Sequence, residues 1–110
     1  MTFDEYQAKA QKTALLSGDF NTDLSHYVLG TVGEAGEVAE KLKKIIRDKN
    51  GVITTEDKET FKKEIGDVLW YLAGLSHHLG YSFDEVAQAN IDKLASRQRR
   101  GTLHGSGDDR

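Results

Sequence analysis

The sequence predicts an all-α protein, a bundle of four helices joined by short loops. Apolar residues recur every three or four positions along most of the chain, as on helix faces that pack against a core. No stretch shows the alternation of apolar and polar residues that is typical of a half-buried strand. The 110 residues include no proline, so no helix interior is interrupted by one.

The first two helices are expected at residues 3–16 and 24–47. Thr2 and Glu5 have the spacing of a capping box, in which each side chain satisfies the other residue's backbone N–H. Residues 21–23 form a polar loop that offers an N-cap for the second helix.

The third helix is expected at residues 56–79, after an N-cap at Thr54 or Thr55. A fourth helix opens at a second capping box, formed by Ser82 and Glu85. Four helices with loops this short are typical of a bundle. Residues 1–100 thus form a single domain, and the glycine-containing residues 101–110 are expected to be a flexible tail.

Three glycines, at positions 30, 33 and 36, recur inside the second expected helix. Each costs a helix about 1 kcal/mol relative to alanine, so their presence needs a physical reason. Close approach of a neighbouring helix is one reason, and close approach of a ligand is another. The sequence leaves both open.

Composition excludes several classes of protein. The net charge of −3 argues against a nucleic-acid binder that works by bulk electrostatics. There is no cysteine, and therefore no disulfide or thiolate metal site. No apolar run approaches the ~20 residues of a membrane span, and residues 1–5 have no signal-peptide pattern. We expect a cytoplasmic protein that binds neither nucleic acid nor membrane.

Two short acidic motifs stand out on the second and third expected helices. Glu34 and Glu37 form E-x-x-E, and Glu64 and Asp67 form E-x-x-D. A spacing of three places both carboxylates of each motif on one helix face. Two such faces brought together make a cage of oxygen ligands, which suits Mg²⁺ or Mn²⁺. A di-iron site would instead require histidine one turn from glutamate.

An alternative interpretation treats these acids as a solvated helix surface. Glu37 is followed four residues later by Lys41, and Glu40 by Lys44, which is the spacing of ordinary surface ion pairs. The other motif acids have apolar or aromatic residues at that position: Glu34, Glu64 and Asp67. A carboxylate beside an apolar stripe is costly unless it is paired or bound to metal.

Four stretches in addition carry a resemblance that covers almost the whole chain: residues 2–7, 33–41, 66–72 and 90–97. Together with the two acidic motifs, which they partly contain, they resemble the MazG-like family of all-α nucleoside triphosphate pyrophosphohydrolases. One departure is visible. Some relatives carry a further glutamate directly before the first motif acid, where this chain has Gly33. That difference leaves the general base unassigned.

The resemblance implies a reaction in which an NTP or dNTP and water give the monophosphate and pyrophosphate, with Mg²⁺ or Mn²⁺ as cofactor. It implies that the metal ligands are Glu34, Glu37, Glu64 and Asp67. Glu34, Glu37 and Glu64 are the candidate catalytic residues, with Glu37 chosen as the acceptor of the water proton. Because four bare carboxylates would repel a triphosphate, this chemistry depends on the divalent ion.

The candidate substrate-binding residues are Asn90, Lys93, Arg97, Trp70 and Lys41. The resemblance implies that Asn90 and Lys93 contact phosphate or sugar, and Arg97 lies one turn beyond them. Trp70 is a candidate for stacking on the base, although such a tryptophan is also an ordinary core residue. Lys93 and Arg97 also fit an alternative interpretation, in which they are cations that stabilise the C-terminal end of a helix.

Self-association is expected as well, as a dimer or a tetramer. The helices carry more apolar face than a lone 110-residue bundle can cover, and the resemblance also implies association. Two other functions stay open. One is a non-catalytic helical interaction module with the acids as a docking surface, and the other is the same chemistry on a phosphoribosyl-ATP-type or damaged nucleotide. The sequence does not specify a base.

Overall fold

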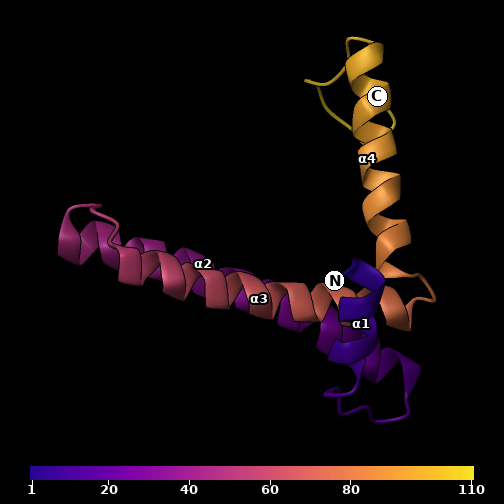
Figure 1. Ribbon diagram of the computed structural model, residues 1–110, viewed down its shortest axis with the longest axis horizontal. Helices are drawn as coiled ribbons and strands as arrows, with labels where there is room; N and C mark the ends of the chain where they lie inside the picture. Colours follow the sequence, from indigo (N-terminus) through magenta and orange to yellow (C-terminus); the bar gives the residue numbers. More distant parts are fainter.

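The computed structural model describes residues 1–110 and contains four helices and no strand (Figure 1). The helices are α1 (Phe3–Gln11), α2 (Phe20–Lys49), α3 (Thr55–His78) and α4 (Phe83–Arg99). The predicted all-α class is confirmed. None of these helices combines the length and the apolar character needed to cross a membrane.

The prediction was wrong about where α1 ends and α2 begins. The helix α1 stops at Gln11 rather than at residue 16. Just beyond this end, the Thr13 hydroxyl donates to the Ala10 carbonyl at 2.7 Å and accepts from the Trp70 indole N–H at 2.8 Å. The N-cap of α2 is Asp19, upstream of the expected loop, and its carboxylate accepts from Thr22 N–H at 2.9 Å.

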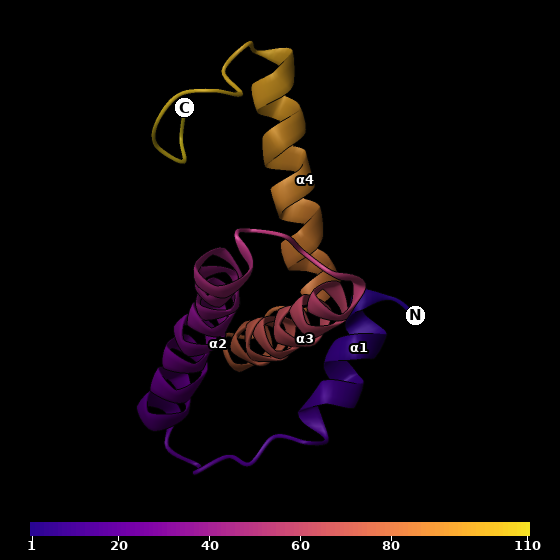
Figure 2. The ribbon, with the colours of Figure 1, turned by 90° about the vertical axis from the view of Figure 1, so that its left-hand side faces the viewer.

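The long helices α2 and α3 lie side by side and antiparallel, joined by a tight turn (Figures 1 and 2). Asn50 ends α2 in the left-handed conformation, with φ at 53°. Thr54 is the N-cap of α3 and forms a complete capping box with Asp57. These local signals place the turn within a residue or two of the prediction.

Two glycines allow α2 and α3 to pack closely. A Cβ added at Gly30 would lie 2.0 Å from the Tyr71 ring, and one added at Gly74 would lie 2.2 Å from the Tyr27 ring. Each tyrosine thus packs against the backbone of the opposite helix. The packing explanation holds for Gly30, whereas Gly33 and Gly36 have nothing within 4 Å of an added Cβ.

The buried side chain of Gln7 joins α1, α3 and the start of α4. Its Nε2 donates to the carbonyls of Ala73 and Tyr81, both at 3.1 Å, and its Oε1 accepts from Phe83 N–H at 3.2 Å. Nearby, the backbone N–H of Asp84 donates to the Asp4 carboxylate at 2.8 Å. These bonds place the N-terminus of α4 against α1.

The capping box predicted at the start of α4 is only half formed. Ser82 Oγ accepts from Glu85 N–H at 3.1 Å, as predicted. The expected return bond, from Ser82 N–H to the Glu85 carboxylate, is absent. Glu85 is exposed and instead lines a shallow hollow on α4, together with Asn90 and Lys93.

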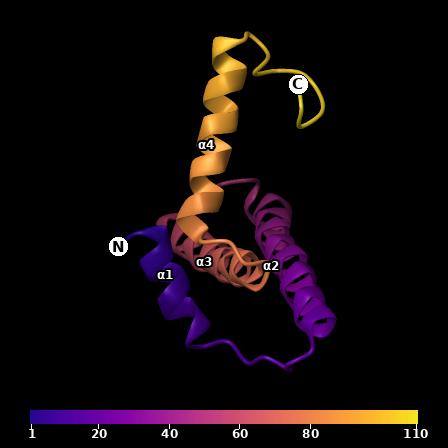
Figure 3. The same cartoon turned by 90° about the vertical axis from the view of Figure 1, so that its right-hand side faces the viewer.

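The rest of α4 leaves the other helices and projects away from the α2–α3 pair (Figures 1 and 3). It contacts α1 and α3 near its N-terminus but does not contact α2. The radius of gyration is 17.0 Å, whereas a compact domain of about 100 residues has about 13 Å. Only ten of the 110 residues are buried. The single chain is therefore an open assembly of helices with a small core.

Candidate functional site

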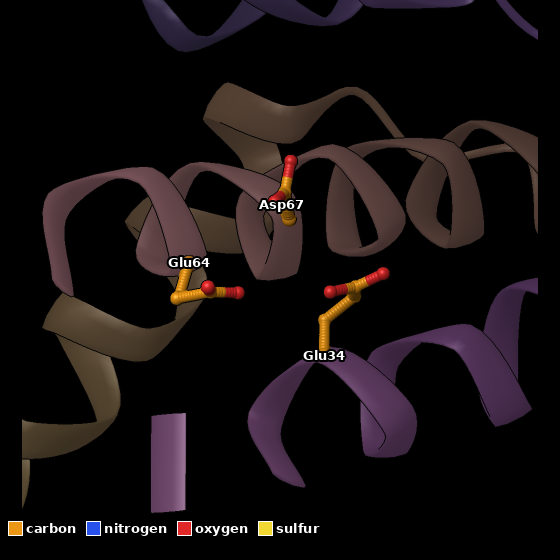
Figure 4. A group of neighbouring side chains, drawn as sticks. All are labelled: Glu34, Glu64 and Asp67. Carbon is orange, nitrogen blue, oxygen red and sulfur yellow. The ribbon is translucent and has the colours of Figure 1, made fainter. Parts of the chain in front are cut away.

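Three acidic side chains converge between α2 and α3 (Figure 4). Glu34 comes from α2, and Glu64 and Asp67 come from successive turns of α3. One carboxylate oxygen from each lies within 4.8 Å of the others. Glu34 and Glu64 are half-buried and Asp67 is exposed. The two acidic motifs, 30 residues apart when counted from Glu34 to Glu64, therefore supply one cluster, which we call the acidic triad.

Glu37, the fourth predicted ligand, is exposed and lies outside the triad. The surface pair expected between Glu37 and Lys41 is absent as well. Lys41 instead reaches across to α3, where its Nζ lies 3.7 Å from Glu64 Oε1. Glu40 is paired with Lys44 at 3.7 Å, as expected for a surface acid. A predicted substrate-binding lysine thus lies directly beside the triad.

The electrostatics of the triad favour a cation. Partial desolvation raises the pKa of Glu34, and the nearby charges of Asp67, Glu64 and Glu37 raise it further. Burial, with a contribution from Asp67, also raises the pKa of the Tyr6 hydroxyl. Carboxylates this close repel one another, and a positive charge placed among them offsets the repulsion. Lys41 supplies one such charge, at one edge only.

An entirely apolar hollow of about 360 Å³ lies on the same two helices. Three of the residues that line it follow a triad acid directly in sequence: Ala35, Ile65 and Val68. The others are Val38, Leu69 and Leu72. A charged cluster beside an apolar hollow can bind a ligand or a partner that has both a charged part and an apolar part.

The predicted phosphate-binding residues lie apart from the triad, on the projecting part of α4. Asn90 and Lys93 line a second hollow, of about 430 Å³, on the outer side of α4. Arg97 is buried, with 4% of its surface exposed, beneath residues 101–110. Because α4 does not contact α2, a single chain does not bring these residues to Glu34.

Comparison with known proteins supplies the family. Residues 23–102 match the MazG nucleotide pyrophosphohydrolase domain. The chain belongs to the MazG family. It is also 47% identical over 114 residues to the "Gene 37 protein" of Mycobacterium phage L5, across the full length of both chains. No solved structure matches the chain.

The MazG match covers the triad and all five predicted substrate-binding residues but not α1. Trp70 lies within it, half-buried, with its ring 5.0 Å from Tyr71 and 6.1 Å from Tyr27. Its indole N–H is held by Thr13. In this MazG domain the tryptophan is therefore part of the aromatic packing between helices.

Sequence reasoning gave no functional role to three residues outside the matched range: Tyr6, Gln7 and Asp108. Both Tyr6 and Gln7 belong to the stretch 2–7 that resembles small members of the family. Spacing placed Tyr6 on the apolar stripe of the first helix and assigned Gln7 no role. Asp108, in the tail, pairs with Lys93 at 3.2 Å and with Arg97 at 3.3 Å. No local pattern marks an acid in a glycine-containing tail as the partner of a helix fifteen residues upstream.

Proposed function

We propose that this MazG-family chain hydrolyses nucleoside triphosphates, as NTP or dNTP, between the α- and β-phosphates to give the monophosphate and pyrophosphate. The observation that carries the proposal is the acidic triad, with oxygens of Glu34, Glu64 and Asp67 within 4.8 Å, in a chain of a pyrophosphohydrolase family. A phosphoanhydride substrate is strongly anionic, so the acids serve it only through a divalent cation.

The donor set fits Mg²⁺ or Mn²⁺. All three side chains offer hard carboxylate oxygens, and the chain has no cysteine to attract softer metals. Glu34, Glu64 and Asp67 would hold the ion, and Glu37, one turn from Glu34, stays a predicted fourth ligand. When bound, the ion neutralises phosphate charge and lowers the pKa of a coordinated water.

The remaining residues have roles that follow from their positions. Glu37 is also our choice for the group that accepts the water proton, because its exposed carboxylate lies one helical turn from Glu34 and so close to a coordinated water. Lys41 holds Glu64 from one side and places a positive charge at the edge where phosphates would approach. The apolar hollow on α2 and α3 would receive the less polar end of the nucleotide.

A panel of NTPs and dNTPs, each with Mg²⁺ or Mn²⁺, tests the proposed reaction. Pyrophosphate and orthophosphate are detected separately, since only cleavage between the α- and β-phosphates releases pyrophosphate directly. We expect pyrophosphate and a monophosphate in equal amounts from at least one nucleotide. No release from any member of the panel, with either metal, would favour the non-catalytic interaction module.

Metal binding has a stability signature that does not depend on turnover. A raised Glu34 pKa means that the folded state disfavours its charged form, so folding stability falls as pH rises through that pKa. A bound cation removes this penalty. At about 100 times its Kd, Mn²⁺ should stabilise the wild type by about 2.7 kcal/mol. For a domain of this size, that raises the Tm by roughly 10 °C or more.

Glu34→Gln should lose this response to Mn²⁺ at pH 7, and without metal it should melt above the wild type because one repulsive charge is gone. Glu59→Gln is the matched control, because Glu59 is exposed and pairs only with Lys62. Thermal melts followed by circular dichroism, with and without Mn²⁺, measure both effects. An unchanged response in Glu34→Gln would remove Glu34 from the metal site.

We further propose that the functional unit is a dimer or a tetramer. Large apolar side chains are exposed along α2, among them Leu29, Val32, Leu42 and Ile46. Because α4 projects away, Lys93 lies apart from the triad within one chain. A second copy of the chain would bring its own α4 residues to the triad. Light scattering coupled to gel filtration should give at least twice the 12.2 kDa chain mass. A mass of one chain at micromolar concentration would contradict the proposal.

A further inference from the structure

Residues 101–110 fold back along the C-terminal end of α4 and form a loop (Figures 2 and 3). The side chain of Arg110 holds the loop, donating to the carbonyls of Thr102 at 3.2 Å, Leu103 at 3.1 Å and Gly107 at 2.6 Å. Arg100 donates to the Arg110 carbonyl at 2.9 Å and ties the loop to the end of the helix. The structure therefore gives a defined path to the ten residues that the sequence predicted to be a flexible tail.

Within this loop, Asp108 contacts the two cations of α4 that were predicted to bind substrate. Its carboxylate lies 3.2 Å from Lys93 Nζ and 3.3 Å from Arg97 Nη2. The Asp108 carbonyl accepts from Arg97 Nη2 as well, at 2.5 Å. The hydrogen bonds from Lys93 and Arg97 lower the pKa of Asp108, so it is ionised at neutral pH. One anionic group thus bridges both cations.

Two features make this contact replaceable. The Asp108 side chain is 85% exposed, so water screens its attraction to the cations. The Arg97 guanidinium is almost completely buried, yet its Nε has no hydrogen-bond partner. A guanidinium can donate two parallel bonds to a phosphate or a carboxylate, and Asp108 does not use that capacity. A polyphosphate offers more negative charge and more acceptor oxygens than one carboxylate.

We propose that residues 101–110 are an autoinhibitory strap, in which Asp108 occupies Lys93 and Arg97 until a polyphosphate displaces it. The inference rests on the proposed function, because it takes these two cations as phosphate contacts. Lys93 also lines the hollow that contains Asn90. Release of the strap therefore frees a positive charge at the edge of that hollow. The strap weakens the binding of any anion that engages α4.

The full-length variants Asp108→Asn and Asp109→Asn form a matched pair. Both remove one negative charge from neighbouring positions, but only Asp108 contacts Lys93 and Arg97. Their affinities for inorganic tripolyphosphate are measured by calorimetry without metal. Loss of an exposed ion pair should tighten binding by about two- to fivefold in Asp108→Asn. Asp109→Asn should bind as the wild type does. Equal affinities in all three proteins would overturn the strap.

Tail mobility gives a second readout. In ¹⁵N relaxation measurements on the wild type, the order parameters of Gly105 and Gly107 should be near those of the helices without ligand. They should fall below about 0.6 at saturating tripolyphosphate. A tail that stays rigid in the saturated protein would contradict the proposal that tripolyphosphate displaces Asp108.

The two proposals fail in different ways. If tripolyphosphate releases the tail but no nucleotide is hydrolysed, displacement of Asp108 by an anion stands, whereas the proposed reaction and the inhibitory role of the strap both fail. If nucleotides are hydrolysed with the same KM in the wild type and both variants, the reaction stands and the strap fails. The measurements therefore separate the two.

Discussion

Glu64→Gln is expected to reduce pyrophosphate release by about 1,000-fold or more while leaving the fold intact. Glu64 is half-buried between α2 and α3, it supplies one oxygen to the acidic triad, and it is paired with Lys41 at 3.7 Å. The amide has nearly the same shape but no charge, so the cation would lose a ligand. Lys41 would lose its partner as well.

Glu59→Gln is the matched control for this experiment. Glu59 lies on the same helix, five residues earlier in the sequence, and its exposed carboxylate pairs only with Lys62 at 3.0 Å. The control should keep wild-type turnover, and circular dichroism should show the same helix content in both variants. Asp67→Asn should behave as Glu64→Gln does. Full activity in either triad variant would end the assignment of the metal site.

Gly74→Ala is expected to destabilise the protein by about 2 kcal/mol. A methyl group at this position would lie 2.2 Å from the ring of Tyr27, which is fully buried. Overpacking of this kind costs up to about 3 kcal/mol, and the better helix propensity of alanine returns about 1 kcal/mol. The Tm should fall by roughly 10 °C for a domain of this size.

Gly66→Ala is the control, on the same helix and with nothing within 4 Å of an added Cβ. With no neighbour to displace, it should gain up to about 1 kcal/mol from helix propensity. Urea unfolding measures the free energy of unfolding of both variants, which should fall in Gly74→Ala and rise in Gly66→Ala. A Gly74→Ala protein as stable as the wild type would show that Tyr27 moves freely, and that the close packing of α2 on α3 is not required.

Local patterns carried much of the helix prediction. The capping box at Thr2 and the N-cap at Thr54 are formed as predicted, because the partners of each lie within one helical turn. The end of α1 was misplaced because the apolar spacing continues to Ala14, whereas the helix stops at Gln11.

For the acids of the candidate site, spacing along each helix predicted part of the arrangement and helix packing decided the rest. Spacing placed Glu34 with Glu37 on one face, and Glu64 with Asp67 on another. Spacing did not decide how α2 is rotated against α3. That rotation is set by the Tyr27 and Tyr71 rings against the backbones of Gly74 and Gly30.

By itself, the sequence determined the all-α class, the four helices and the residue types able to hold a hard cation, because each depends on neighbours within a few positions. Only the tertiary structure decided which of these residues meet. It placed Glu34 with Glu64 and Asp67, left Glu37 outside, and turned α4 away with Arg97 beneath the tail. The physical reason is that these arrangements rest on contacts between distant residues, such as those of Gln7, which local periodicity does not encode.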